Sequence, residues 1–125
     1  LRRFVAELAQ LPGRKVLVHG GGKGASQLLA SLGIEPRMVE GRRITDAPTL
    51  DVVTMFYAGK TNKQLVALLQ TQGLNALGLS GADGNVLRTQ KRPVRDVDYG
   101  FVGDLTADSV NAELLALLLE AGVLP

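Results

Sequence analysis

The chain has 125 residues, of which 46% are hydrophobic and 21% charged, and its formal net charge at pH 7 is +2. This length and composition are typical of one globular domain with its own core. The small, scattered basic excess argues against nucleic-acid binding, and no apolar run approaches the roughly 18 residues needed to cross a membrane. The absence of cysteine excludes disulfide and thiolate chemistry and fits a cytoplasmic protein.

A strand, a glycine turn and a helix form the strongest local pattern. An amphipathic helix is predicted over residues 1–11, followed by a buried strand at residues 15–19 (K-V-L-V-H). Gly20-Gly21-Gly22 comes directly after this strand. Apolar residues at helical spacing over 25–32 then predict a helix that Gly33 caps.

A longer helix is predicted in the middle of the chain. A turn is expected near Glu40-Gly41, within an extended stretch. Thr45 or Asp46 can cap the helix that follows, and Pro48 suits its first turn. Gly59 is expected to bend or interrupt this helix.

The second half predicts a strand, a tight turn, a hairpin and a last helix. The strand lies at residues 76–79, the turn at 81–85 and the two hairpin strands at 86–89 and 97–105. Strands that alternate with helices predict an α/β three-layer sandwich, with a mostly parallel sheet flanked by helices and a β-hairpin attached. The alternation stops after a helix at one end, and the chain starts without Met. We therefore expect a single domain, residues 1–125, truncated at both ends.

The glycine turn is the leading candidate for a binding site. The first turn of a helix has backbone N–H groups without internal partners, and the helix dipole adds positive charge there. Because glycine has no Cβ, a phosphoryl group or a carboxylate could approach this backbone closely. A tight strand-to-helix turn without a ligand explains the same glycines equally well. The spacing fits neither the P-loop nor the dinucleotide fingerprint.

Five sequence blocks, taken together, are far more specific than the glycine turn alone. They are V-H-G-G-G (18–22), G-R-R-I-T-D (41–46), A-G-K-T-N-K (58–63), G-L-S-G-A-D-G (78–84) and D-Y-G-F-V-G-D (98–104). In order and spacing these blocks resemble N-acetylglutamate kinases of the amino acid kinase family. Sibling kinases share the glycine turn but not the full series.

The resemblance implies phosphoryl transfer from ATP to the side-chain carboxylate of N-acetyl-L-glutamate, in arginine biosynthesis. It implies that Gly21 and Gly22 offer N–H groups to the reacting carboxylate and the transferring phosphoryl group, and that Arg43 clamps the α-carboxylate. Outside its block, Arg43 would suggest only a surface salt bridge. The resemblance also implies a homodimer.

Two basic residues depart from the family pattern. Arg42 replaces the usual apolar residue before the clamp arginine, and Lys23 follows the glycine turn where an uncharged residue is common. Either residue, Arg42 in particular, could favour an acyl group that carries its own carboxylate, as in N-succinyl-L-glutamate. Solvent-facing positions without a ligand role are the other interpretation of both.

The catalytic lysines and aspartate of the family have no counterpart here, so the catalytic residues are unknown. No residue is assigned to ATP, to Mg²⁺ or to another metal, and the chain alone is expected to be inactive. Two alternatives stay open: a non-catalytic domain that binds an acyl amino acid or a partner protein, and a sibling kinase acting on glutamate or UMP.

Several polar residues in the blocks have structural interpretations. His19 ends the strand before the glycine turn and is expected to donate a hydrogen bond that shapes this turn, rather than to act as a base. Lys60, Asn62 and Lys63 are predicted to be helix-surface or hinge residues, with the rim of the site as the alternative. Asp83 is predicted to form a turn.

Overall fold

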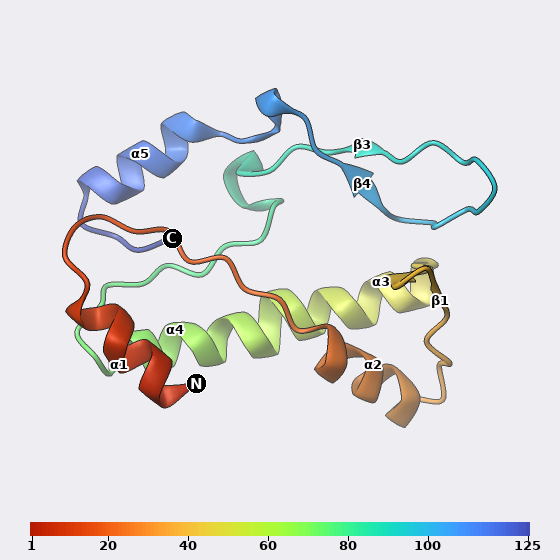
Figure 1. The fold of residues 1–125 in the computed structure, drawn as a ribbon, viewed down its shortest axis with the longest axis horizontal. Helices are drawn as coiled ribbons and strands as arrows, with labels where there is room; N and C mark the ends of the chain where they lie inside the picture. Colours follow the sequence, from red (N-terminus) through yellow and green to blue (C-terminus); the bar gives the residue numbers. More distant parts are fainter.

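The structure is a computed structural model that describes residues 1–125. A long helical rod crosses the molecule, and the C-terminal third of the chain passes over one side of it (Figure 1). Helix α1 packs against α4 of this rod, and α2 packs against α3 and η1. The elements in chain order are α1 (Arg2–Gln10), α2 (Gly22–Ser31), β1 (Met38–Val39), β2 (Arg42–Arg43), α3 (Ala47–Thr54), η1 (Met55–Thr61), α4 (Asn62–Gln70), η2 (Asp83–Asn85), β3 (Gln90–Lys91), β4 (Gly103–Asp104), η3 (Ala107–Ser109) and α5 (Ala112–Glu120).

The rod consists of α3, η1 and α4 in direct succession. Asp46 caps its first turn, where its Oδ1 accepts the N–H of Thr49 at 3.0 Å and a proline follows in the predicted position. Around Gly59 the chain widens into a π-helix instead of breaking. The predicted interruption is thus a change of helical pitch, and π segments of this kind occur often near functional sites.

The predicted mostly parallel sheet is not formed. Leu17 donates its N–H to Pro125 O at 3.0 Å and Leu77 donates to Leu124 O at 2.9 Å, so the C-terminal residues lie along both predicted strands. Only an isolated parallel bridge, Ala76 with Leu124, results. A longer ladder needs a donor at each step, and Pro125 has no N–H. The two predicted strands are extended segments that do not bond to each other.

Two short antiparallel hairpins replace that sheet. In the first, β1 pairs with β2 across the predicted Glu40-Gly41 turn, whose φ values of 50° and 76° match a two-residue hairpin loop. In the second, β3 pairs with β4. β4 lies within the predicted strand 97–105, but β3 comes just after the predicted strand 86–89, so the first strand of the predicted hairpin is displaced. The predicted strand 86–89 pairs instead near Val110, through a bridge to Leu87.

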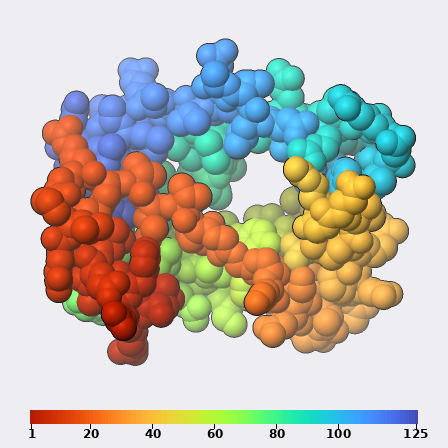
Figure 2. All heavy atoms as spheres, viewed as in Figure 1, coloured from red at the N-terminus to blue at the C-terminus, as the bar shows by residue number.

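The apolar core is divided into two clusters at opposite ends of the rod. One contains Val5, Leu65, Leu69, Ala76 and Leu124. The other contains Ala25, Leu29, Val52 and Val53. Only 14 of 125 residues are buried, so much apolar surface stays open. Figure 2 shows the corresponding hollow between the C-terminal third and the helices below it.

Candidate functional site

The glycine turn leads directly into helix α2, as predicted. Gly21 is the N-cap residue and Gly22 the first helical residue, and no side chain caps this end. The first N–H groups of α2 therefore lack both an intrahelical partner and a side-chain acceptor. A Cβ at Gly20 or Gly22 would meet nothing within 4 Å, so the backbone is open on this side. Lys23, in the same helical turn, is exposed.

Arg43 lies against this turn although it is distant in sequence. Its guanidinium donates to Gly22 O at 3.1 Å, to the Ser26 hydroxyl at 2.6 Å and to the Tyr57 hydroxyl at 3.0 Å. Its Nε is buried and has no acceptor. The structure thus brings Arg43 and the glycine turn together, with a half-buried positive charge beside free backbone N–H groups.

Arg42 has a different environment from Arg43. Adjacent residues of a strand point to opposite faces, and Arg42 is exposed while Arg43 is half-buried. The positive charge of Arg42 reaches Asp104, whose pKa lies below its ordinary value mainly because Arg92 donates a hydrogen bond to it. The structure therefore groups Arg42 with the β3–β4 hairpin and not with the glycine turn.

Helix α2 approaches the rod closely through its glycines, a feature that the sequence analysis missed. A Cβ at Gly24 would overlap the ring of Phe56, and one at Gly21 would lie 3.0 Å from Cδ1 of Tyr57. The three-residue spacing of these glycines places them on one helical face. That spacing was the available signal, but nothing local identified the aromatic partner.

A polar cluster begins at His19. As expected, His19 hydrogen-bonds at the turn, with Nδ1 3.2 Å from Gly20 O. Its Nε2 lies 3.1 Å from Nδ2 of Asn62, which is only 5% exposed. The prediction of a helix-surface position is therefore wrong for Asn62, because the rod turns this residue toward the glycine turn, as in the alternative of a position at the rim of the site. Asp83 accepts the N–H and the hydroxyl of Ser80 at 2.6 Å, which confirms its turn role and lowers its pKa.

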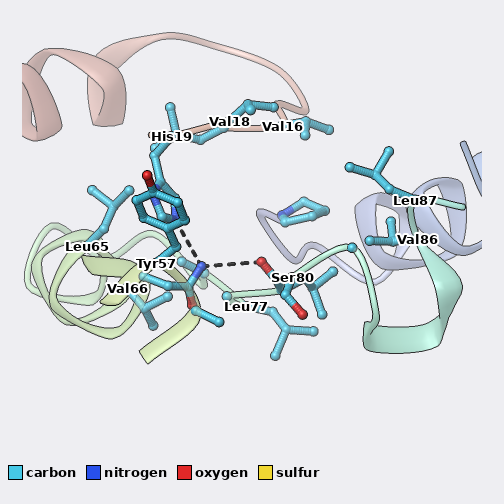
Figure 3. A pocket seen from close by; sticks show the side chains of 18 of the residues that line it. Val16, Val18, His19, Tyr57, Leu65, Val66, Leu77, Ser80, Val86 and Leu87 are labelled. Carbon is cyan, nitrogen blue, oxygen red and sulfur yellow. Dashed lines mark hydrogen bonds between the residues drawn. The ribbon is translucent and has the colours of Figure 1, made fainter. Parts of the chain in front are cut away.

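A cavity of about 500 Å³ lies beside the glycine turn. Hydrophobic residues make up 17 of the 24 that line it, including Val16, Val18 and Leu77 (Figure 3). His19 and Asn62 form part of its wall, but Gly21, Gly22 and Arg43 do not. Because its lining is mostly apolar, this space adjoins the candidate anion site without being part of it.

No three His, Cys, Asp or Glu side chains gather where they could hold a metal ion. The helices are also all too short or too polar to traverse a lipid bilayer.

Comparison with known proteins gives consistent matches along the chain. The amino acid kinase family pattern matches residues 1–125. An acetylglutamate kinase of Parabacteroides distasonis is 59% identical over 125 residues, which are 100% of this chain and 48% of that protein. One of Methanopyrus kandleri is 50% identical, over 97% of this chain and 50% of that protein. The chain thus spans about half the length of the curated relatives it matches.

Two solved structures have a similar fold. An N-acetylglutamate synthase from Neisseria gonorrhoeae, complexed with coenzyme A and N-acetyl-glutamate, has a TM-score of 0.76 at 26% identity over 98% of this chain and 28% of its own. The smu.665 protein of Streptococcus mutans has a TM-score of 0.77 over 95% of this chain and 47% of its own, and its 22% identity supports the fold alone. From the family pattern across residues 1–125, the chain belongs to the amino acid kinase family.

Proposed function

We propose that this chain provides the acyl-amino-acid-binding part of an N-acetylglutamate kinase, which transfers a phosphoryl group from ATP to the side-chain carboxylate of N-acetyl-L-glutamate in arginine biosynthesis. The observation that carries the proposal is the hydrogen bond from Arg43 to Gly22 O, across 21 residues of sequence. This contact supports a single site in which the guanidinium of Arg43 and the backbone N–H groups of the glycine turn can both bind anions. The names of the relatives support the same reaction.

Each group suits one end of a dicarboxylic ligand. The guanidinium of Arg43 can bind the α-carboxylate with two parallel hydrogen bonds between oppositely charged groups, whereas the Tyr57 and Ser26 hydroxyls that it now contacts are neutral acceptors. The N–H groups at Gly21 and Gly22 face developing negative charge at the other end, where the dipole of α2 adds to the stabilisation. Phosphoryl transfer depends mainly on such positioning and charge neutralisation.

ATP is the co-substrate that the proposed reaction requires, and Mg²⁺ would neutralise its phosphates. The residues of this chain do not fit a metal site, since no acidic side chains gather in sufficient number. We therefore assign neither ATP nor Mg²⁺ to any residue here, and the chain alone should not turn over. The proposal includes a cytoplasmic homodimer.

Acyl-group selectivity is a finer proposal. Lys23 is exposed in the helical turn next to Gly22, whereas Arg42 lies toward Asp104. If an N-succinyl group is preferred, we expect Lys23 to contribute more than Arg42 to that preference.

Titration calorimetry tests the proposed ligand. N-acetyl-L-glutamate should bind more tightly than glutamate or UMP, and Arg43→Ala should weaken its binding about 10- to 100-fold, the effect of losing charged hydrogen bonds. Arg14→Ala, at an exposed position, serves as the matched control. N-succinyl-L-glutamate, titrated into Lys23→Ala and Arg42→Ala, measures selectivity.

The results separate the alternatives. Preferential binding of glutamate or UMP would favour a sibling kinase. Binding of N-acetyl-L-glutamate without ADP formation, in the protein as produced from its gene, would favour a non-catalytic binding domain. Equal affinities of Arg43→Ala and Arg14→Ala would contradict the proposed site.

A further inference from the structure

A chain of hydrogen bonds connects the glycine turn with helix α4. His19 Nδ1 lies 3.2 Å from Gly20 O, His19 Nε2 lies 3.1 Å from Asn62 Nδ2, and Lys63 Nζ donates to Asn62 Oδ1 at 3.1 Å. We propose that His19, Asn62 and Lys63 are positioning residues, which fix the proton of His19 on Nδ1 and thereby orient the N–H of Gly21. The consequence for ligand binding rests on the proposed function; the consequence for His19 and the turn does not.

The partners of His19 determine where its proton lies. A carbonyl oxygen only accepts hydrogen bonds, so Nδ1 must donate to Gly20 O. An amide NH₂ group only donates, so Nε2 must accept from Asn62. One donor and one acceptor on the ring correspond to a neutral imidazole with its proton on Nδ1.

The direction of the Asn62 amide is itself fixed. Its Nδ2 also donates to Leu79 O at 3.4 Å, and its Oδ1 accepts from Lys63 Nζ. Rotating the amide by half a turn would place its NH₂ group against the ammonium of Lys63 and its oxygen against Leu79 O. Neither contact could form a hydrogen bond. The two dashed lines in Figure 3 meet at one nitrogen, between the labelled His19 and Ser80. They are the hydrogen bonds of Asn62 Nδ2 to His19 Nε2 and to Leu79 O.

Gly78 makes room for this arrangement. Lys63 Nζ donates to Gly78 O at 3.0 Å, and a Cβ at Gly78 would overlap Oδ1 of Asn62. Since Asn62 is 5% exposed, few of its hydrogen bonds can be replaced by bonds to water. The segment around Gly78 and Leu79 is thereby connected to the extended segment that leads into the glycine turn.

Because the peptide bond is planar, the hydrogen bond from His19 to Gly20 O also determines the direction of the Gly21 N–H. The C=O of Gly20 and the N–H of Gly21 belong to one trans peptide unit, so they point in opposite directions. The hydrogen bond from His19 holds the carbonyl of Gly20 toward the His19 ring. It therefore directs the N–H of Gly21 away from this ring, where a ligand anion can accept it. A different proton position on His19 would release this peptide unit.

Asn62→Asp is the decisive variant because it is isosteric. A carboxylate still accepts from Lys63 but cannot donate to His19 Nε2. His19 is the only histidine, so its ring ¹⁵N signals in NMR spectra need no assignment. We expect the wild-type signals of an imidazole protonated on Nδ1, and in Asn62→Asp a proton on Nε2 together with a shifted Gly21 amide signal. Asn75→Asp makes the same change at an exposed position and should move neither signal.

Steady-state kinetics of the protein expressed from its whole gene measure how the substitutions change the binding of N-acetyl-L-glutamate. Asn62→Asp should raise the KM for N-acetyl-L-glutamate about tenfold, with a smaller effect on kcat, because one oriented N–H is lost. Lys63→Met, which buries no new charge, should give mixed proton positions on His19 and a smaller rise in KM. It keeps the test valid if Asn62→Asp does not fold.

A wild-type proton on Nε2, or an unchanged His19 and Gly21 in both variants, would overturn the inference. If the NMR changes occur but the wild type does not bind N-acetyl-L-glutamate, the positioning role stands and the proposed function fails.

Discussion

Two adjacent arginines of β2 have opposite environments, and the reason lies in strand geometry. Arg43 points to α2 and η1, where Gly22 and Ser26 of α2 and Tyr57 of η1 accept its hydrogen bonds. Arg42 is exposed on the other side of the strand. From the block G-R-R-I-T-D alone, we could not have predicted which of the two arginines faces the glycine turn. Side chains alternate between the two faces of a strand, but this alternation does not show which element each face contacts.

The carboxyl groups of Asp46, Asp83 and Asp104 predict the behaviour of the protein in acid. Hydrogen bonds from Thr49, Ser80 and Arg92, respectively, are the main cause of their lowered pKa values. A carboxyl whose pKa is lower in the folded state stabilises the fold above its unfolded value, here 3.8. This contribution is lost as the pH falls below that value and through the lowered pKa. We therefore expect the Tm to be steady down to about pH 4 and to fall below it.

Thermal unfolding between pH 7 and pH 2.5, followed by circular dichroism, measures this effect. In Asp104→Asn the Tm should fall less steeply below about pH 4 than in the wild type, because this substitution removes one of the three carboxyl groups. Asp51→Asn is the matched control at an exposed helical position. If the Tm falls equally steeply below about pH 4 in Asp104→Asn, Asp51→Asn and the wild type, the stabilising role of the Asp104 carboxylate is contradicted.

At the scale of elements, the contact between α2 and η1 depends on Gly24. Alanine normally stabilises a helix interior by about 0.5–1 kcal/mol relative to glycine. At Gly24 its Cβ would overlap Phe56, so Gly24→Ala should destabilise the fold by about 1–3 kcal/mol, as overpacking does. At Gly59, where no atom lies within 4 Å of an added Cβ, Gly59→Ala should be stabilising.

Urea unfolding of the two variants gives the comparison, and Gly24→Ala/Phe56→Leu should recover part of the loss by removing ring atoms. Stabilisation by alanine at both positions would show that α2 has room to move away from the rod.

Secondary-structure elements were predicted correctly from the sequence where neighbouring residues in the chain determine where the element begins or ends. Asp46 caps α3 because its own side chain reaches the next turn, and Gly33 ends α2 with a φ of 74°. The strand at residues 15–19 failed as a prediction because a ladder needs a partner, which no local pattern supplies. The burial of Asn62 was missed for a similar reason, since it depends on how the π segment rotates α4 relative to α3.

The same distinction applies to the candidate site. The pattern of an extended segment, a glycine turn and a helix indicated free N–H groups at the turn from the residues alone, and the resemblance to a family identified Gly21 and Gly22 among them. The approach of Arg43 was expected only through the resemblance to a family, and the aromatic support from Phe56 was not expected. Contacts between elements are decided by packing over the whole molecule, and periodicity within one element carries little information about them.

At the scale of the whole molecule, the rod connects two cores that share no residue. Leu29 and Leu69, 0% and 2% exposed, belong to different cores. Leu29→Val and Leu69→Val should each destabilise the fold by about 1 kcal/mol, the effect of removing a buried methylene group. Substitutions without shared partners usually add to within about 0.5 kcal/mol. If the rod does not couple the two cores, the free energy of unfolding of the double variant, measured in urea, should therefore fall by about 2 kcal/mol.

Leu65→Val combined with Leu69→Val, within one core, is the matched pair of substitutions for which coupling is expected. A large coupling between Leu29 and Leu69 would mean that the π segment transmits packing changes along the rod, since it is the element that joins the two cores.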